Sequence, residues 1–157
     1  MRAQYIEAIN MVPVKFPERS IFLAGGISGC DDWQNTAKEF LQDLDITIIN
    51  PRRNDFNIEN MLNSVDQIKW EHKYLSSCSH TMFWFPDATL CPITLFELGK
   101  CLAYNKMKND TEKLYIGCAP SYKRVFDVEI QSMLMGYHRP IFKDLNSLLT
   151  FIKTELS

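Results

Sequence analysis

The chain has 157 residues, of which 46% are hydrophobic and 23% are charged, and its formal net charge at pH 7 is −2. A chain of this size can bury the core of one domain without disulfides or metals, and its composition excludes a disordered or fibrous protein. The slightly acidic balance also argues against binding to nucleic acid polymers, which depends on clustered Lys and Arg side chains.

Cysteine usage and the N-terminal sequence indicate the compartment. The five cysteines form no Cys-x-x-Cys pair: Cys30, Cys78, Cys91, Cys101 and Cys118. An odd, scattered set is typical of reduced thiols. The N-terminus lacks the basic start and apolar run of a signal peptide, and no segment approaches the ~20 apolar residues of a membrane span. We therefore expect a cytoplasmic protein with no membrane contact.

Residues 1–19 have no clear hydrophobic period, and Pro13 and Pro17 discourage a helix that runs into the following segment. We expect an N-terminal arm here and a single domain over residues 20–157. Within that domain, β-rich runs alternate with helical patterns. Strands are predicted at 21–24, 46–49, 81–85, 114–118 and 140–142, and helices from about 31, over 64–77, from 94, over 127–134 and from 144.

This alternation predicts an α/β fold, a three-layer sandwich with about five parallel strands. With the common strand order 2-1-3-4-5, the switch point of the sheet lies between the first and third strands. Ligands bind beyond the carboxyl ends of the strands at such a point. The topology therefore selects the loops 25–32 and 85–94 as the site.

Glu97 is the first candidate for chemistry. Thr94-x-x-Glu97 has the form of a capping box, in which the glutamate only accepts a backbone N–H at the start of a helix. The positive helix end would also keep a carboxylate in the first turn ionised. An ionised carboxylate can attack an anomeric carbon and form a covalent glycosyl-enzyme. The residues leave both roles open.

Asp87 ends the predicted third strand, beside Pro86. A second carboxyl group near Glu97 could protonate or hydrogen-bond a departing base. Formation of the turn is the alternative role of Asp87. Two acidic residues from adjoining elements are common, so this pair alone leaves the function open.

The glycine loop that includes Gly25, Gly26 and Ile27 could bring backbone N–H groups to a phosphate or a sugar hydroxyl, or could be a tight turn. After the second strand, Arg52 or Arg53 could bind a phosphate through a bidentate contact, or could be solvated. Both features follow strands at the same edge of the predicted sheet.

Trp33 could stack on a base, although a tryptophan in this pattern more often packs in the core. The three histidines show no ligand spacing, and neither an HExxH motif nor a Cys/His cluster is present. We therefore expect no metal and no cofactor.

A series of short motifs resembles the nucleoside 2-deoxyribosyltransferase-like family from about Ser20 to Ala119. The motifs are Ile21-Phe22-Leu23-Ala24-Gly25-Gly26-Ile27, Asp32-Trp33, Asn50-Pro51-Arg52-Arg53, Gln67-Ile68-x-Trp70-Glu71, Phe83-Trp84-Phe85-Pro86 and Phe96-Glu97-Leu98-Gly99. The resemblance implies a flavodoxin-like fold and a homo-oligomer whose subunits share active sites.

The resemblance also implies residue roles. The glutamate of the E-L-G motif, here Glu97, is the nucleophile, and the acidic residue of the preceding helix, here Glu71, helps to hold the base. Asp87 matches an aspartate that ends the third strand. Well-known members carry another aspartate nearer the glutamate, where this chain has Leu90-Cys91-Pro92.

These observations predict an enzyme of nucleoside salvage that transfers a 2-deoxyribosyl group between nucleobases through an ester on Glu97. Its partners would be small nucleosides or nucleotides and free nucleobases. Hydrolysis of a nucleoside or nucleoside 5′-monophosphate is the first alternative, and Arg52, Arg53 and the glycine loop motivate the monophosphate version. A non-catalytic nucleotide-sensing domain is the second. A phosphoacceptor receiver domain ranks lower, because Ala24-Gly25 replaces the acidic pair that would hold its metal.

Overall fold

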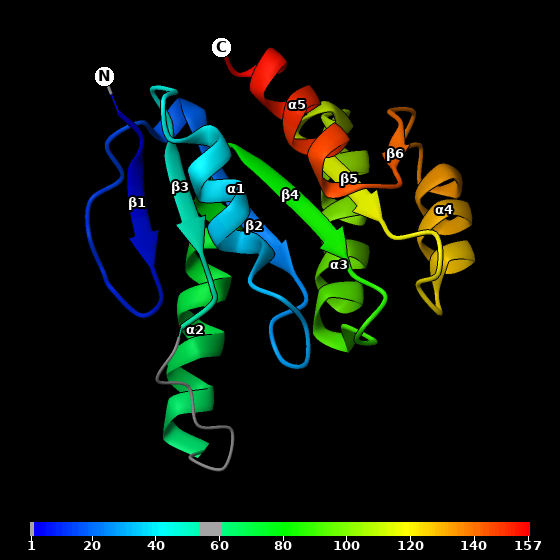
Figure 1. The fold of residues 1–157 in the computed structure, drawn as a ribbon, viewed down its shortest axis with the longest axis horizontal. Coiled ribbons are helices and arrows are strands. Elements are labelled where there is room, and N and C mark those ends of the chain that lie inside the picture. The colour runs from blue at the N-terminus through cyan, green and yellow to red at the C-terminus, as the bar shows by residue number, and fades with distance from the viewer. Residues whose placement is uncertain (1, 54–60) are drawn as a thin grey trace.

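A parallel sheet runs through the centre of the computed structural model, which describes residues 2–53 and 61–157 (Figure 1). In the described residues the sheet has six strands in the order β1-β3-β2-β4-β5-β6. The strands are β1 (Gln4–Glu7), β2 (Ser20–Gly25), β3 (Thr47–Asn50), β4 (His80–Phe85), β5 (Leu114–Cys118) and β6 (Ile141–Phe142). All five pairings between neighbours are parallel.

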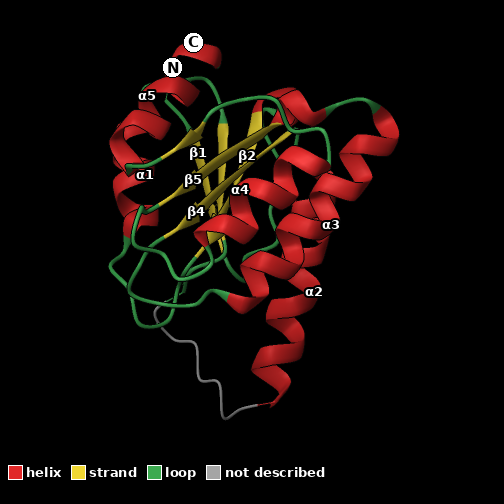
Figure 2. Cartoon of the chain, turned by 90° about the vertical axis from the view of Figure 1, so that its right-hand side faces the viewer, coloured by secondary structure: helices red, strands yellow, loops and turns green. Residues whose placement is uncertain are grey.

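Helices cover both faces of this sheet (Figure 2). They are α1 (Trp33–Leu41), α2 (Met61–Ser77), α3 (Pro92–Lys108), α4 (Val125–Leu134) and α5 (Leu145–Glu155), with short 3-10 turns η1 (Pro17–Arg19) and η2 (Thr111–Lys113). Helices α1 and α5 pack on one face, and α2, α3 and α4 pack on the other. The predicted flavodoxin-like three-layer sandwich is confirmed.

Strand β2 shows why the central strands are continuously apolar. Phe22 and Ala24 belong to the core beneath α2, α3 and α4, whereas Ile21 and Leu23 belong to the core beneath α1 and α5. All four side chains are fully buried. Because alternate residues of a strand face opposite sides, a strand that is covered on both faces needs apolar residues at every position.

The predicted order of five strands corresponds to β3-β2-β4-β5-β6, and the structure adds a sixth strand, β1, at the outer edge. Strand β1 comes from the N-terminal residues and pairs with β3, with Tyr5 opposite Ile48. Its four residues include one fully buried side chain, Ile6. A segment this short shows no hydrophobic period, and its pairing depends on a strand more than forty residues away in the chain.

Two predicted helix starts are wrong, and a third is confirmed. Helix α2 is already helical at Met61, upstream of Ser64. Helix α3 begins at Pro92 rather than after Thr94, because proline fits the first helical position, where no N–H partner is required. The helix predicted from residue 144 is α5, and Asp144 caps it, since its Oδ1 accepts the backbone N–H of Ser147 at 2.8 Å.

Candidate active site

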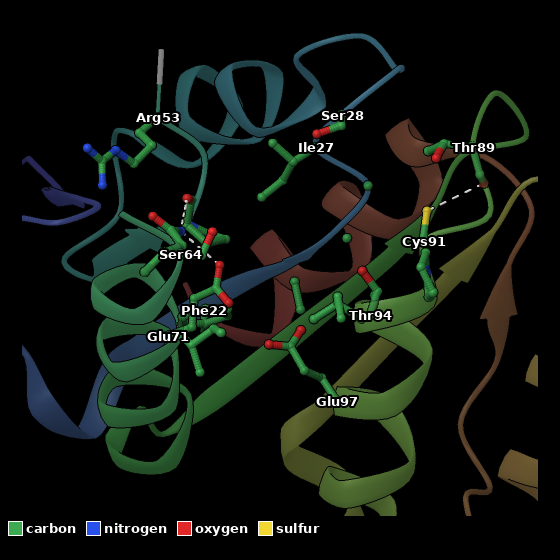
Figure 3. A pocket seen from close by; sticks show the side chains of 18 residues that line it. Phe22, Ile27, Ser28, Arg53, Ser64, Glu71, Thr89, Cys91, Thr94 and Glu97 are labelled. Atoms are coloured by element: carbon green, nitrogen blue, oxygen red, sulfur yellow. Dashed lines mark hydrogen bonds between the residues drawn. The ribbon is translucent and has the colours of Figure 1, made fainter. Parts of the chain in front are cut away.

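A cavity of about 400 Å³ opens at the carboxyl ends of β2 and β4, on the face of the sheet that α2 and α3 cover (Figure 3). Its walls are the β2–α1 loop, the end of β3, the facing sides of α2 and α3, and the end of the β4–α3 loop. The cavity therefore lies at the switch point that the topology selects. Its volume falls in the range of small-molecule sites.

Two carboxyl groups meet in this cavity. Glu71 projects from α2 and Glu97 from α3, and Figure 3 shows their carboxyl groups pointing toward each other. Both side chains are half-buried. Burial and, to a smaller extent, the nearby Glu71 together raise the pKa of Glu97 to about 7, although Lys100 partly offsets their effect. Glu97 lies in the second turn of α3, so the expected ionisation by the helix end is not met.

Glu71 is held by a neighbour on the same helix. Burial raises the pKa of Glu71, and a hydrogen bond from Gln67 partly offsets this shift. Gln67 Nε2 donates to Glu71 Oε1 at 2.8 Å and to the carbonyl oxygen of Pro51 at 2.7 Å. Because both partners are acceptors, the amide orientation of Gln67 is fixed. Gln67 was not selected from the sequence, although its spacing of four residues from Glu71 places both on one helix face.

Asp87 lies outside this cavity. Its side chain is exposed after β4, and its Oδ2 accepts the hydroxyl of Ser121 at 2.6 Å. It borders a separate hollow on the α1 side of the sheet, which Trp33 also lines. The structure therefore brings Glu71 and Glu97 together and keeps Asp87 apart from them.

The glycine loop borders the cavity, and Trp33 supports the loop from behind. Gly25, Gly26 and Ile27 line the cavity. The Trp33 side chain is 4% exposed, and its Nε1 donates to the carbonyl oxygen of Gly26 at 2.8 Å. A Cβ atom on Gly25 would lie 2.4 Å from the Trp33 ring, so only glycine fits there. Trp33 thus packs in the core and contacts the loop instead of facing the cavity.

The two adjacent arginines differ in their surroundings. The Arg52 guanidinium donates to three carbonyl oxygens of the loop after β2 and to Oε1 of Gln34, and it lies 3.7 Å from Asp32 Oδ1. Arg53, in contrast, lines the cavity. The guanidinium of Arg52 is therefore engaged by the loop, whereas Figure 3 shows the guanidinium of Arg53 directed away from Glu71 and Glu97.

The described part of the chain offers neither a metal site nor a membrane-spanning helix. Among residues 2–53 and 61–157, no three His, Cys, Asp or Glu side chains are grouped so that they could hold a metal ion. Over the same residues, no helix has both the length and the apolar character that crossing a membrane requires.

The fold and the cavity define a class of α/β proteins with flavodoxin-like topology and a carboxyl-lined small-molecule site at the switch point. A family model described as "Nucleoside 2-deoxyribosyltransferase like" matches residues 18–118, which contain every wall of the cavity. The chain therefore belongs to the nucleoside 2-deoxyribosyltransferase-like family, which indicates an enzyme that processes nucleosides. A search of curated proteins gave no match.

Proposed function

We propose that this protein transfers a 2-deoxyribosyl group from one nucleobase to another, with Glu97 as the nucleophile. The observation that carries the proposal is the pair formed by Glu97 and Glu71 in one cavity within the family region. A pair of carboxyl groups beside the scissile bond is the arrangement that glycosidic bond cleavage uses, and the cleavage retains configuration when one of the two is the nucleophile.

The two carboxyl groups share one proton, and this sharing makes one group a proton donor and the other a nucleophile. Ionisation of one group opposes ionisation of the other, so the pair keeps a proton close to neutral pH. In the proposed reaction this proton passes through Glu71 to the leaving base. Glu97 is then a carboxylate, and it attacks C1′ of the sugar as the N-glycosidic bond breaks and its electron pair moves to the base.

The second half of the reaction reverses the first with a different base. A nitrogen of the acceptor base attacks C1′, the ester bond to Glu97 breaks, and the acceptor's proton returns to the carboxyl pair. Two displacements at the same carbon give net retention. Asp87 takes no part in this scheme, because it bonds Ser121 outside the cavity.

A base-exchange assay tests the proposal. Purified protein is incubated with a deoxynucleoside and a different free base, and chromatography detects the exchanged nucleoside. Glu97→Gln should abolish exchange, because the amide cannot form the ester, whereas the exposed Glu18→Gln should leave the rate unchanged. Absence of exchange with every common base, or exchange that survives in Glu97→Gln, would contradict the proposal.

Hydrolysis of a nucleoside 5′-monophosphate is the second candidate. The presence of Arg53 in the same cavity as Gly26 and Ile27 favours it, since guanidinium and backbone N–H groups both bind phosphate. Release of free base without an acceptor, faster from the monophosphate than from the nucleoside, would support this activity. Equal rates from the two substrates would count against a phosphate site.

We also propose that two copies of the chain associate through the outer sides of α2, α3 and α4. Large apolar side chains are exposed there: Val65, Ile68, Ile93, Phe96, Phe126, Ile130, Met133 and Leu134. Ile68 and Ile93 are 63% and 64% exposed and also line the cavity. A second copy on this face would bury apolar surface and cover the cavity mouth at the same time.

A further inference from the structure

Side chains of α1 and of the segment after β3 donate hydrogen bonds to the carbonyl groups of the loop after β2. The carbonyl oxygen of Gly26 accepts hydrogen bonds from Trp33 Nε1 and from Gln34 Nε2, at 2.8 and 3.1 Å. Arg52 binds the carbonyl oxygens of Ile27, Cys30 and Asp31 at 3.0, 2.9 and 2.9 Å.

Gln34 joins these two sets of contacts. Its Oε1 accepts from Arg52 Nη1 at 3.0 Å, while its Nε2 donates to Gly26. Both ends of the amide are thus used, and the side chain is fully buried. Arg52, Gln34 and Trp33 therefore form one network that fixes the direction of the loop's carbonyl groups.

That direction also fixes where the loop's N–H groups point. The peptide bonds of this loop are trans, and in a trans peptide the C=O and N–H groups point in opposite directions. The carbonyl of Gly26 points toward α1, so the N–H of Ile27 points away from α1, toward the face of the sheet on which the cavity lies. The carbonyl of Ile27 points at Arg52, so the N–H of Ser28 points away from Arg52.

These two N–H groups belong to residues that line the cavity. Within the described residues, neither N–H has a hydrogen-bond acceptor. Figure 3 shows Ile27 and Ser28 across the cavity from Glu71 and Glu97. A ligand that lies between them would meet carboxyl groups at one end and peptide donors at the other.

We infer that Arg52 is a positioning residue that aims the N–H groups of Ile27 and Ser28 at an oxygen on the sugar end of the substrate. The inference rests on the proposed function, because it assigns the sugar end of that substrate. The recognised chemistry is an oxygen acceptor, which a sugar hydroxyl or a 5′-phosphate supplies. A lysine cannot replace Arg52, since a single ammonium lacks the planar fork that reaches several carbonyl groups together.

The experiment measures binding separately from turnover. The Glu97→Gln protein is titrated with 2′-deoxyadenosine and, separately, with its 5′-monophosphate, while amide resonances are followed by NMR. The Ile27 and Ser28 amides should shift and saturate with the ligand. A larger shift with tighter binding of the monophosphate identifies a phosphate as the acceptor, and equal behaviour identifies a hydroxyl.

Variants at Arg52 test its part. Arg52→Ala and Arg52→Lys, each in the Glu97→Gln background, should weaken binding about tenfold, because two hydrogen bonds to the ligand lose their alignment. Millimolar guanidinium should restore binding to Arg52→Ala, and an equal concentration of sodium chloride should not. Arg124→Ala is the matched control, because Arg124 is exposed, does not line the cavity and forms an ion pair only with Asp127 among the described residues.

In the active enzyme, Arg52→Lys should raise KM about tenfold and leave the pH profile of kcat unchanged, because Glu71 and Glu97 are untouched.

The outcomes of the titration and of the rescue separate the inference from the proposed function. If the amide resonances of Ile27 and Ser28 do not shift while those of Thr94 and of residue 97 do, the inference is wrong and the proposed function stands. If guanidinium fails to restore binding, Arg52 only stabilises the fold, and the inference is again wrong. If no cavity amide shifts with either ligand, both the proposed function and the inference fall.

Discussion

At the scale of single residues, burial of Glu97 should reduce the stability of the folded protein above neutral pH. The folded-state pKa of about 7 lies above the ordinary value of 4.5, so the folded protein binds this proton more tightly than the unfolded chain. The penalty for the ionised carboxylate is absent below pH 4.5, grows as the pH rises toward 7, and is complete above it.

Replacing Glu97 by glutamine removes this penalty. The free energy of unfolding of Glu97→Gln should exceed that of the wild type by roughly 1–3 kcal/mol at pH 8 and should match it more closely at pH 5. Urea denaturation at the two pH values measures the difference. Glu18→Gln, at an exposed position, should show no such dependence, and an equal difference at both pH values for Glu97→Gln would contradict the assignment.

The same pair predicts the pH dependence of activity. The profile of kcat/KM reports ionisation in the free enzyme, so its acidic limb should reflect the Glu97 pKa of about 7. In Glu71→Gln the carboxyl group that helps to raise this pKa is absent, and the limb should move to lower pH. The rate should also fall, on the order of 100-fold, because the proposed proton donor is lost. An acidic limb that stays in place would show that the two carboxyl groups do not interact.

At the scale of elements, the close packing of β2 against α1 predicts that a side chain on Gly25 destabilises the protein. A Cβ atom on Gly25 would lie 2.4 Å from both the Trp33 ring and the carbonyl oxygen of Trp84, and the backbone of β4 cannot move aside without disturbing the sheet. Gly25→Ala should therefore lower the free energy of unfolding by about 1–3 kcal/mol.

Gly99→Ala provides the matched control for this change. Gly99 lies within α3, and no atom outside its own helix turn comes within 4 Å of its Cβ position. Alanine should stabilise the helix there by about 0.5–1 kcal/mol. Thermal unfolding of both variants measures the contrast, and similar shifts for the two would show that the Trp33 contact does not constrain the loop.

The elements also show what the sequence could and could not predict. Strand β5 matches its predicted residues because Leu114–Cys118 is an apolar run that is buried along its whole length. Strand β1 was missed because its Gln4–Glu7 segment gains its structure from pairing with β3. The start of α3 was misplaced because Cys91 adopts a left-handed backbone conformation, with a φ of 49°, which its residue type does not suggest.

The candidate site divides in the same way. The motif series selected Glu97 and Glu71, whose helix positions determine which side they face. The directions of Asp87 and Arg52 depend on the paths of the loops after β4 and β3, and residue spacing carries no information about those paths. The structure accordingly turns Asp87 toward Ser121 and Arg52 toward the loop after β2.

At the scale of the whole molecule, the apolar surface on α2, α3 and α4 predicts self-association that matters for activity. Phe96 is 72% exposed on α3, next to Glu97 in the chain. Phe96→Glu places a charge on the proposed interface, where a partner would have to desolvate it. Sedimentation velocity should show a smaller species for Phe96→Glu than for the wild type, and base exchange per chain should fall.

A control comes from helix α5, which packs beside α1 on the face of the sheet opposite the proposed interface. Lys153 of α5 donates there to the carbonyl oxygen of Phe40 in α1. Thr150→Glu, on an exposed turn of α5, adds the same charge without touching the proposed interface. It should leave both the sedimentation coefficient and the rate unchanged. Because activity that requires association depends on protein concentration, dilution of the wild type should reproduce the loss seen with Phe96→Glu. A wild type that sediments as a monomer with a constant rate per chain would show that the cavity functions without a partner.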